Sequence, residues 1–127
     1  MNKDTNQFKK EFKAKLYRFV LLLITFVDGL DKRDPTCRVV SEQLIDSGTG
    51  TLSNYLEAQV ASSKKDFANY FRYCLKCVNE SKMWIAVLRD SNKSDVNKAN
   101  NLLNELEEIG KIFASSLITI KNKAKNY

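Results

Sequence analysis

The sequence predicts an all-α protein, folded as an antiparallel up-down-up-down four-helix bundle. Apolar residues recur at steps of three and four along four long segments, which is the spacing of one face of a helix. No segment alternates apolar and polar residues strictly enough to predict a strand. At 127 residues the chain is long enough for one domain and too short for two, so residues 1–127 are assigned to a single bundle.

The first helix is predicted over residues 5–28, with Thr5 as N-cap and Gly29 as the stop. Because every third or fourth residue of this segment is large and apolar, one face is expected to lie in the core. That face consists of Phe8, Phe12, Leu16, Phe19, Leu23, Phe26 and Leu30.

The second helix is predicted from residue 35 to about residue 61. Asp34 supplies an N-cap, and Pro35 suits the first helical position because its φ is already fixed near the helical value. Gly48 and Gly50 lie in the middle of this segment. Glycine weakens a helix interior, so the sequence predicts that the second helix is kinked or broken near these two residues.

The third helix is predicted from Ser63, which begins a capping-box-like SKKD segment, to about Asp90. Its apolar stripe is Phe67, Phe71, Cys74, Val78, Ser81, Ile85 and Leu88. The fourth helix is predicted after Ser94, taken as its N-cap, and is expected to fray in the final KNKAKNY. Its stripe is Ala99, Leu103, Leu106, Ile109, Phe113, Leu117 and Ile120.

The composition excludes much enzyme chemistry. The chain has no His, which rules out Ser-His-Asp triads, HExxH zinc sites and Glu-x-x-His di-iron bundles. Its four Gly form no phosphate-binding loop. We therefore expect no catalytic residues and no cofactor. A mutase of the chorismate type needs only Arg, Lys and Glu in a helical bundle, but Arg18, Arg38, Arg72 and Arg89 are too dispersed along the chain to converge.

The cysteines and apolar runs indicate a reducing compartment and no membrane span. Cys74 and Cys77 form a CxxC without a second pair. Zinc needs four ligands, so both are expected to be reduced, metal-free and directed into the core. The longest apolar run, from Phe19 to Val27, is far shorter than the roughly 20 residues of a membrane helix. The N-terminus lacks a secretory pattern, and the protein is expected in the cytoplasm.

Two helices carry apolar residues outside their core stripes, which predicts self-association. A helix that is apolar all round needs a second partner surface. Scattered exposed apolar residues on a monomer are the alternative interpretation. The predicted oligomer interface consists of Tyr17, Leu21 and Ile24 on the first helix, and Tyr73, Trp84 and Val87 on the third.

Basic residues also cluster on these two helices, within a chain of net charge +6. Positive side chains at helical spacing suit the phosphates of RNA or DNA, although a solvated helix face explains them equally well. No motif that reads bases is present, so little sequence preference is expected. The candidate nucleic-acid-binding residues are Lys9, Lys10, Lys13, Lys15 and Arg18, followed by Lys65, Asn69, Arg72 and Lys76.

The segment from Ser47 to Asp90 resembles the bacterial four helix bundle protein family, whose founding members are encoded by intervening sequences in large-subunit ribosomal RNA genes. The resemblance rests on the SGTG segment, an N-x-x-E turn (Asn54 and Glu57), SKKDF, NESKxWxxxLRD and a fourth-helix tail from Leu103 to Lys121. Between Asn54 and Glu57, Tyr55 and Leu56 are larger than is usual in the family.

This resemblance implies an all-α protein that assembles into a ring, commonly a pentamer, and it transfers no catalytic residue. A related protein is the accessory variability determinant of diversity-generating retroelements, which partners a reverse transcriptase and binds nucleic acid. Whether this chain belongs with a retroelement or with a ribosomal RNA insertion stays open. Two functions are therefore expected: an oligomer that binds nucleic acid or a ribonucleoprotein partner, or a purely structural protein–protein interaction module.

Overall fold

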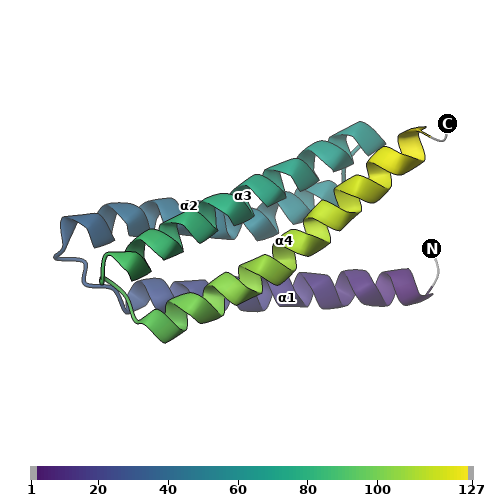
Figure 1. Ribbon diagram of the computed structural model, residues 1–127. Coiled ribbons are helices and arrows are strands. Elements are labelled where there is room, and N and C mark those ends of the chain that lie inside the picture. The colour runs from purple at the N-terminus through teal and green to yellow at the C-terminus, as the bar shows by residue number, and fades with distance from the viewer. Residues whose placement is uncertain (1–2, 126–127) are drawn as a thin grey trace.

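A computed structural model describes residues 3–125 and contains four α-helices in that range (Figure 1). They are α1 (Lys3–Asp28), α2 (Pro35–Gln59), α3 (Lys64–Asp90) and α4 (Val96–Lys125). No strand occurs among these residues. The predicted all-α fold class is therefore confirmed.

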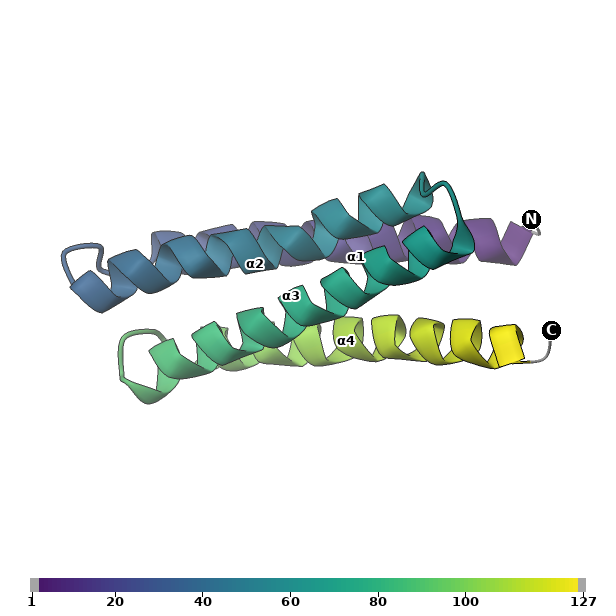
Figure 2. The ribbon, with the colours of Figure 1, turned by 90° about the horizontal axis from the view of Figure 1, so that it is seen from above.

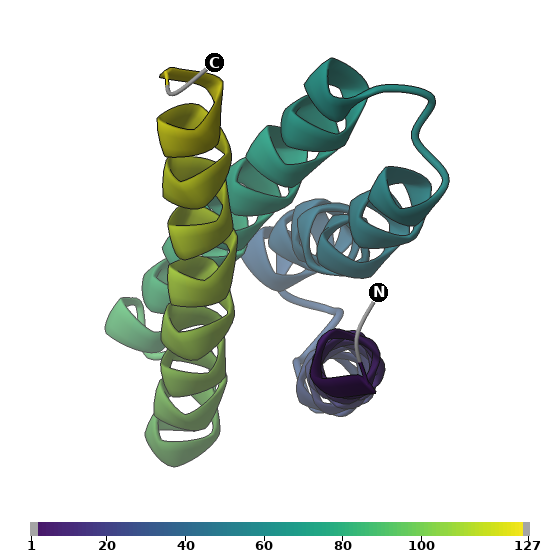
Figure 3. The same ribbon diagram turned by 90° about the vertical axis from the view of Figure 1, so that its right-hand side faces the viewer.

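The helices run alternately in opposite directions, so the loops after α1 and α3 lie at one end of the bundle (Figures 1 and 2). The loop between α2 and α3 lies at the other end, together with the N-terminal part of α1 and the C-terminal part of α4. The pairs α1–α2, α2–α3, α3–α4 and α1–α4 pack together, whereas α1 and α3 lie on opposite sides. The α1–α4 contact is the least extensive, and these two helices diverge toward the end that carries the termini (Figures 1 and 3).

Four aromatic side chains, one from each helix, close the core toward this end. The Phe113 ring lies 5.2 Å, centroid to centroid, from the rings of both Phe12 and Phe71, in edge-to-face geometry. Tyr55 completes the cluster, with its ring 5.2 Å from that of Phe12. Such aromatic pairs add to the stabilisation that burial of their area provides. The cluster therefore links all four helices beneath the divergent end.

The middle of α2 is a continuous helix, so of the predicted kink or break near Gly48 and Gly50 the break is wrong. The glycines allow close packing instead. A Cβ atom at Gly48 would overlap the Leu23 side chain of α1, and one at Gly50 would lie 2.6 Å from the Cys77 sulfur of α3. Next to Gly48 in the chain, the hydroxyl of Ser47 lies 2.9 Å from that of Ser81 in the core. Tight packing on two sides keeps the helix intact in spite of its glycines.

Several predicted helix ends are confirmed. Asp34 caps α2 by accepting from the Cys37 N–H, and Pro35 is the first residue of that helix. The Ser63 hydroxyl accepts from the Asp66 N–H and caps α3. The helix α1 ends at Asp28, directly before Gly29.

Other details of the sequence prediction are wrong. Thr5 lies inside α1 and is not its N-cap. Asp95 caps α4 in place of Ser94, because its carboxylate accepts from the Lys98 N–H at 2.8 Å. The helix α4 continues to Lys125 instead of fraying, and residues 126 and 127 of the predicted frayed end lie outside the described residues.

The predicted core stripes are mostly correct. Phe8 is 52% exposed because it lies at the divergent end, beyond the aromatic cluster. At the same end, Phe67, Leu117 and Ile120 are only partly buried. In α4, Leu102 is buried and Leu103 is only half-buried, so at this one turn the buried residue comes one position earlier than predicted.

Candidate nucleic-acid interface

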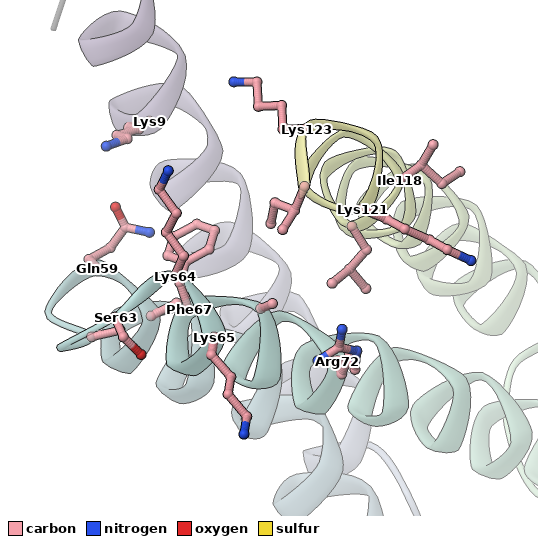
Figure 4. Close-up of a pocket in the computed structure, with 15 residues that line it drawn as sticks. Lys9, Gln59, Ser63, Lys64, Lys65, Phe67, Arg72, Ile118, Lys121 and Lys123 are labelled. Carbon is pink, nitrogen blue, oxygen red and sulfur yellow. The ribbon is translucent and has the colours of Figure 1, made fainter. Parts of the chain in front are cut away.

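The divergent end of the bundle contains a groove of 1170 Å³ between all four helices (Figure 4). We call it the basic groove. The N-terminal turns of α1 and α3 and the C-terminal turns of α2 and α4 contribute to it, because these segments meet at the same end of an antiparallel bundle. Its lining residues are Lys9, Ala58, Gln59, Ala61, Ser63, Lys64, Lys65, Phe67, Ala68, Arg72, Leu117, Ile118, Ile120, Lys121 and Lys123.

The charge of the groove is entirely positive. Five Lys and one Arg are among its 15 described lining residues, and none of those residues is acidic. Lys64 and Lys123 extend over the space between α1 and α4, whereas Lys65 and Lys121 point outward on either side (Figure 4). Cations gathered around a concave surface concentrate a positive potential, which attracts a polyanion.

Three of the sequence-predicted basic residues lie together in this groove: Lys9, Lys65 and Arg72. The Arg72 guanidinium is oriented by a 2.8 Å hydrogen bond that it donates to the Asn69 side-chain oxygen. Asn69 therefore positions Arg72 and is itself only half-exposed.

The remaining predicted basic residues lie outside the groove. Lys10, Lys13 and Arg18 are exposed on α1. Lys76 borders a separate hollow on α3 of 620 Å³, together with Arg72 and the acidic Glu80. These four residues extend the positive surface without sharing the concave site.

Lys15 is held in a salt bridge between α1 and α4. Its ammonium lies 2.6 Å from Glu108 and 3.1 Å from Glu105. The hydrogen bond to Glu108 raises the pKa of Lys15, and the same contact lowers the pKa of Glu108. Because Lys15 already neutralises two carboxylates, its charge contributes to the contact between α1 and α4.

Lys64, Lys121 and Lys123 line the groove but are not among the residues that the sequence pattern predicts for it. Lys64 directly precedes the predicted Lys65, in the N-terminal turn of α3. A usable signal existed for the other two, because no Asp or Glu follows Glu108 in the chain. Two lysines near the end of this acid-free segment, Lys121 and Lys123, line the groove.

Cys74 and Cys77 face α2, as predicted for core residues, with Cys74 fully buried and Cys77 partly buried. Burial raises the pKa of the Cys74 thiol to about 12 and also raises that of Cys77. Thiols of this kind are poor nucleophiles at neutral pH. Within residues 3–125 no group of three or more His, Cys, Asp and Glu could hold a metal ion.

The predicted oligomer interface lies partly on the surface. Tyr17, Leu21 and Ile24 of α1 are 58%, 48% and 40% exposed, and Tyr73 of α3 is 54% exposed. Trp84 and Val87 are half-buried, and Trp84 packs against the core. Since α1 and α3 are diagonal in the bundle, the three exposed residues of α1 form one apolar patch, and Tyr73 with the half-buried Trp84 and Val87 belongs to a separate surface on α3.

None of the helices in the described part of the chain is both long and apolar enough to cross a membrane. The fold and the groove together define a small all-α bundle protein whose distinguishing surface is a concentrated positive charge.

Comparison with known families identifies the group within this class. The profile of the family described as "23S rRNA-intervening sequence protein" matches residues 15–115. The chain therefore belongs to the 23S rRNA-intervening sequence protein family, as the resemblance in its sequence indicated. The matched segment includes the predicted residues of α3 but excludes Lys9, Lys121 and Lys123 of the groove.

A solved structure supports the fold. The chain is similar to a protein of unknown function from the S23 ribosomal protein family of Bacteroides thetaiotaomicron, with 27% sequence identity and a TM-score of 0.77. The similarity covers 84% of this chain and 97% of that one. A comparison with curated proteins gives no match.

Proposed function

We propose that this protein is a non-catalytic, homo-oligomeric nucleic-acid-binding protein that contacts phosphates through the basic groove. The observation that carries the proposal is that six cationic side chains from three helices surround one groove, with no acidic residue among the described lining. Lys and Arg hold phosphates through charge, without reading sequence. RNA or DNA is the partner, alone or within a ribonucleoprotein that includes a reverse transcriptase. The family name, which refers to a sequence within 23S rRNA, agrees with such a partner.

The arrangement of fixed ion pairs supports the same proposal. Three carboxylates of α4, Glu105, Glu107 and Glu108, are neutralised by lysines of α1 and α3. Near the opposite end, Asp34 pairs with Lys93. By contrast, Lys65, Lys121 and Lys123 form no ion pair within residues 3–125. Their charge is therefore available to an external anion.

Self-association is part of the proposal. A closed ring needs two different complementary patches on each subunit, and the apolar residues of α1 and of α3 supply two patches on diagonal helices. A ring, commonly of five subunits in proteins that resemble this one, presents several basic grooves to one strand. Linked sites bind more tightly than a single site because later contacts form at high effective concentration.

The proposal is tested by charge reversal with a matched control. In the test variant Lys65, Arg72 and Lys121 are replaced by Glu, and in the control Arg33, Arg38 and Lys98 are replaced by Glu. All six residues are exposed, and both variants change the net charge equally. Filter binding to mixed-sequence RNA and to duplex DNA measures the affinity. We expect the test variant to bind at least about tenfold more weakly and the control to remain near wild type.

If wild-type protein binds neither nucleic acid, or if both variants lose affinity equally, the groove is not a phosphate site. The alternative, a purely structural interaction module whose charge serves solubility, would then account for the surface.

A further inference from the structure

The floor of the basic groove is apolar, which phosphate binding alone does not require. Phe67 of α3 and Leu117 and Ile120 of α4 line it, and all three remain partly accessible to solvent. Phe67 packs against the buried Phe71 in a tilted arrangement, with ring centroids 4.4 Å apart, and thereby contacts the aromatic cluster. The floor is thus a rigid apolar surface beneath a cationic rim.

A single nucleic-acid strand matches this combination of surfaces. Its phosphates lie along one side and its unpaired bases along the other, so one ligand can contact both the rim and the floor. Proteins that hold single strands commonly combine a positive groove with apolar or aromatic surfaces that take the base faces. A duplex hides its bases in the stack and would leave this floor unused.

The composition and size of the groove suit nucleobases. Gln59 places an amide among the lining residues, where the edge of a base offers donors and acceptors. The groove volume of 1170 Å³ exceeds the roughly 300–1,000 Å³ of pockets for compact ligands, so it accommodates more than one base.

We infer that the basic groove binds single-stranded nucleic acid, with unstacked bases against Phe67, Leu117 and Ile120 and phosphates at the cations of the rim. This inference rests on the proposed function and adds to it the class of substrate and the part of the ligand that is recognised. Selectivity for single strands arises from contacts to the bases, whereas the salt-dependent affinity arises from the phosphates.

The experiment compares a single strand with an abasic strand, which lacks the bases, and with a duplex, which hides them. Fluorescence anisotropy measures binding of the full-length protein to a labelled oligothymidylate of about eight nucleotides, a length within the range of single-strand sites. The second ligand is an abasic deoxyribose-phosphate strand of equal length, and the third is the matching duplex. We expect the abasic strand and the duplex to bind about tenfold more weakly than oligothymidylate, the loss expected for about one stacked base.

A floor variant provides an independent measurement. Ile120→Ser removes apolar surface from the groove, and Val96→Ser makes the same kind of change at an exposed position of α4 outside it. We expect Ile120→Ser to weaken binding of oligothymidylate severalfold, to leave binding of the abasic strand unchanged, and Val96→Ser to alter neither.

The outcomes separate the inference from the proposed function. Equal affinity for oligothymidylate and the abasic strand would overturn the inference and leave phosphate binding intact. No binding of any of the three ligands would overturn both. Displacement of the strand by polyglutamate as readily as by unlabelled oligothymidylate would show that the groove selects charge alone, which also overturns the inference.

Discussion

At the residue scale, the missing side chain of Gly50 determines how closely α2 and α3 approach. A Cβ atom there would lie 2.6 Å from the Cys77 sulfur, well inside the ordinary contact distance. Asn54 stabilises the same place by donating to the Gly50 carbonyl at 2.9 Å. Gly50 and Cys77 therefore form a complementary pair, in which each residue limits the size of the other.

The contact between Gly50 and Cys77 predicts that Gly50→Ala has opposite effects on stability in the wild type and in a Cys77→Ala background. In the wild type, Gly50→Ala should lower the free energy of unfolding by about 1–3 kcal/mol, because the added methyl group is forced against sulfur. In a Cys77→Ala background, the same substitution should stabilise by up to about 1 kcal/mol, since Ala is the better helix former and the clash is gone. Urea unfolding of the four proteins in this cycle measures both values. Equal effects in the two backgrounds would contradict the close packing.

At the element scale, a few ion pairs connect α4 to its neighbours. Lys15 of α1 pairs with Glu105 and Glu108, and Lys82 of α3 lies 2.6 Å from Glu107. The contact between α1 and α4 is the least extensive of the four, and the Lys15 pairs add to the apolar contact of Phe12 with Phe113 that joins these helices. Beyond them toward the termini, the two helices diverge and leave the groove open (Figure 1).

The acid sensitivity of this connection follows from the pKa shifts. The hydrogen bond from Lys15 lowers the pKa of Glu108 below its ordinary 4.5 in the folded protein. The pair therefore stabilises the fold above that pH and loses its contribution as pH falls through the lowered value. Lys15→Met should be less stable than wild type at neutral pH, and the difference should shrink in acid.

Urea unfolding across the acidic range measures this difference. Lys10→Met, an exposed change on the same helix, serves as the control and should match wild type throughout. A Lys15→Met deficit that is independent of pH would mean that packing of the side chain, and not its charge, joins α1 to α4.

The helices were largely predictable from the sequence, whereas the continuous course of α2 through its two glycines was not. Cap residues such as Asp34 and Ser63 act locally, so the sequence identifies them. Gly48 and Gly50 weaken a helix locally, but they are stabilised by contacts with Leu23 and Cys77 from other helices. Local helix propensity does not include such tertiary contacts, and for that reason it allows a break, as well as a kink, where the helix is continuous.

At the scale of the whole molecule, charge is distributed unevenly between the two ends of the bundle. The loop of residues 29–34 mixes Asp31 and Asp34 with Lys32 and Arg33, so that its charges balance. The opposite end brings the basic residues of α1, α3 and α4 into one groove without a carboxylate in its described lining. Because the positive charge is concentrated at one end, the proposed ligand is expected to bind each subunit at that end.

The candidate site was predictable only in part. Helical periodicity placed Lys65 and Arg72 on one outward face of α3, and both lie in the groove. The addition of Lys121 and Lys123 depends on the antiparallel packing that brings the end of α4 beside the start of α3. A pattern within one helix contains no information about such a neighbour.

Self-association is predicted at this scale from the apolar patch on α1. Wild-type protein should scatter light as a multiple of its 14.6 kDa subunit. Leu21→Glu combined with Ile24→Glu should give the monomer, because burying two carboxylates in an apolar contact is strongly unfavourable. Val39→Glu changes a residue that is 56% exposed on α2 and should leave the assembly intact. A wild type that scatters as a 14.6 kDa species would show that this patch binds no second copy.

The salt dependence of single-strand binding tests the proposed interface most directly. For single strands, the logarithm of the binding constant falls against the logarithm of salt concentration with a slope of about −0.7 for each phosphate contact. Reversal of Lys65, Arg72 and Lys121 to Glu should therefore reduce the steepness by about two, whereas reversal of Arg33, Arg38 and Lys98 should leave it unchanged. Identical slopes for wild type and both variants would contradict a phosphate-binding groove at the divergent end of the bundle.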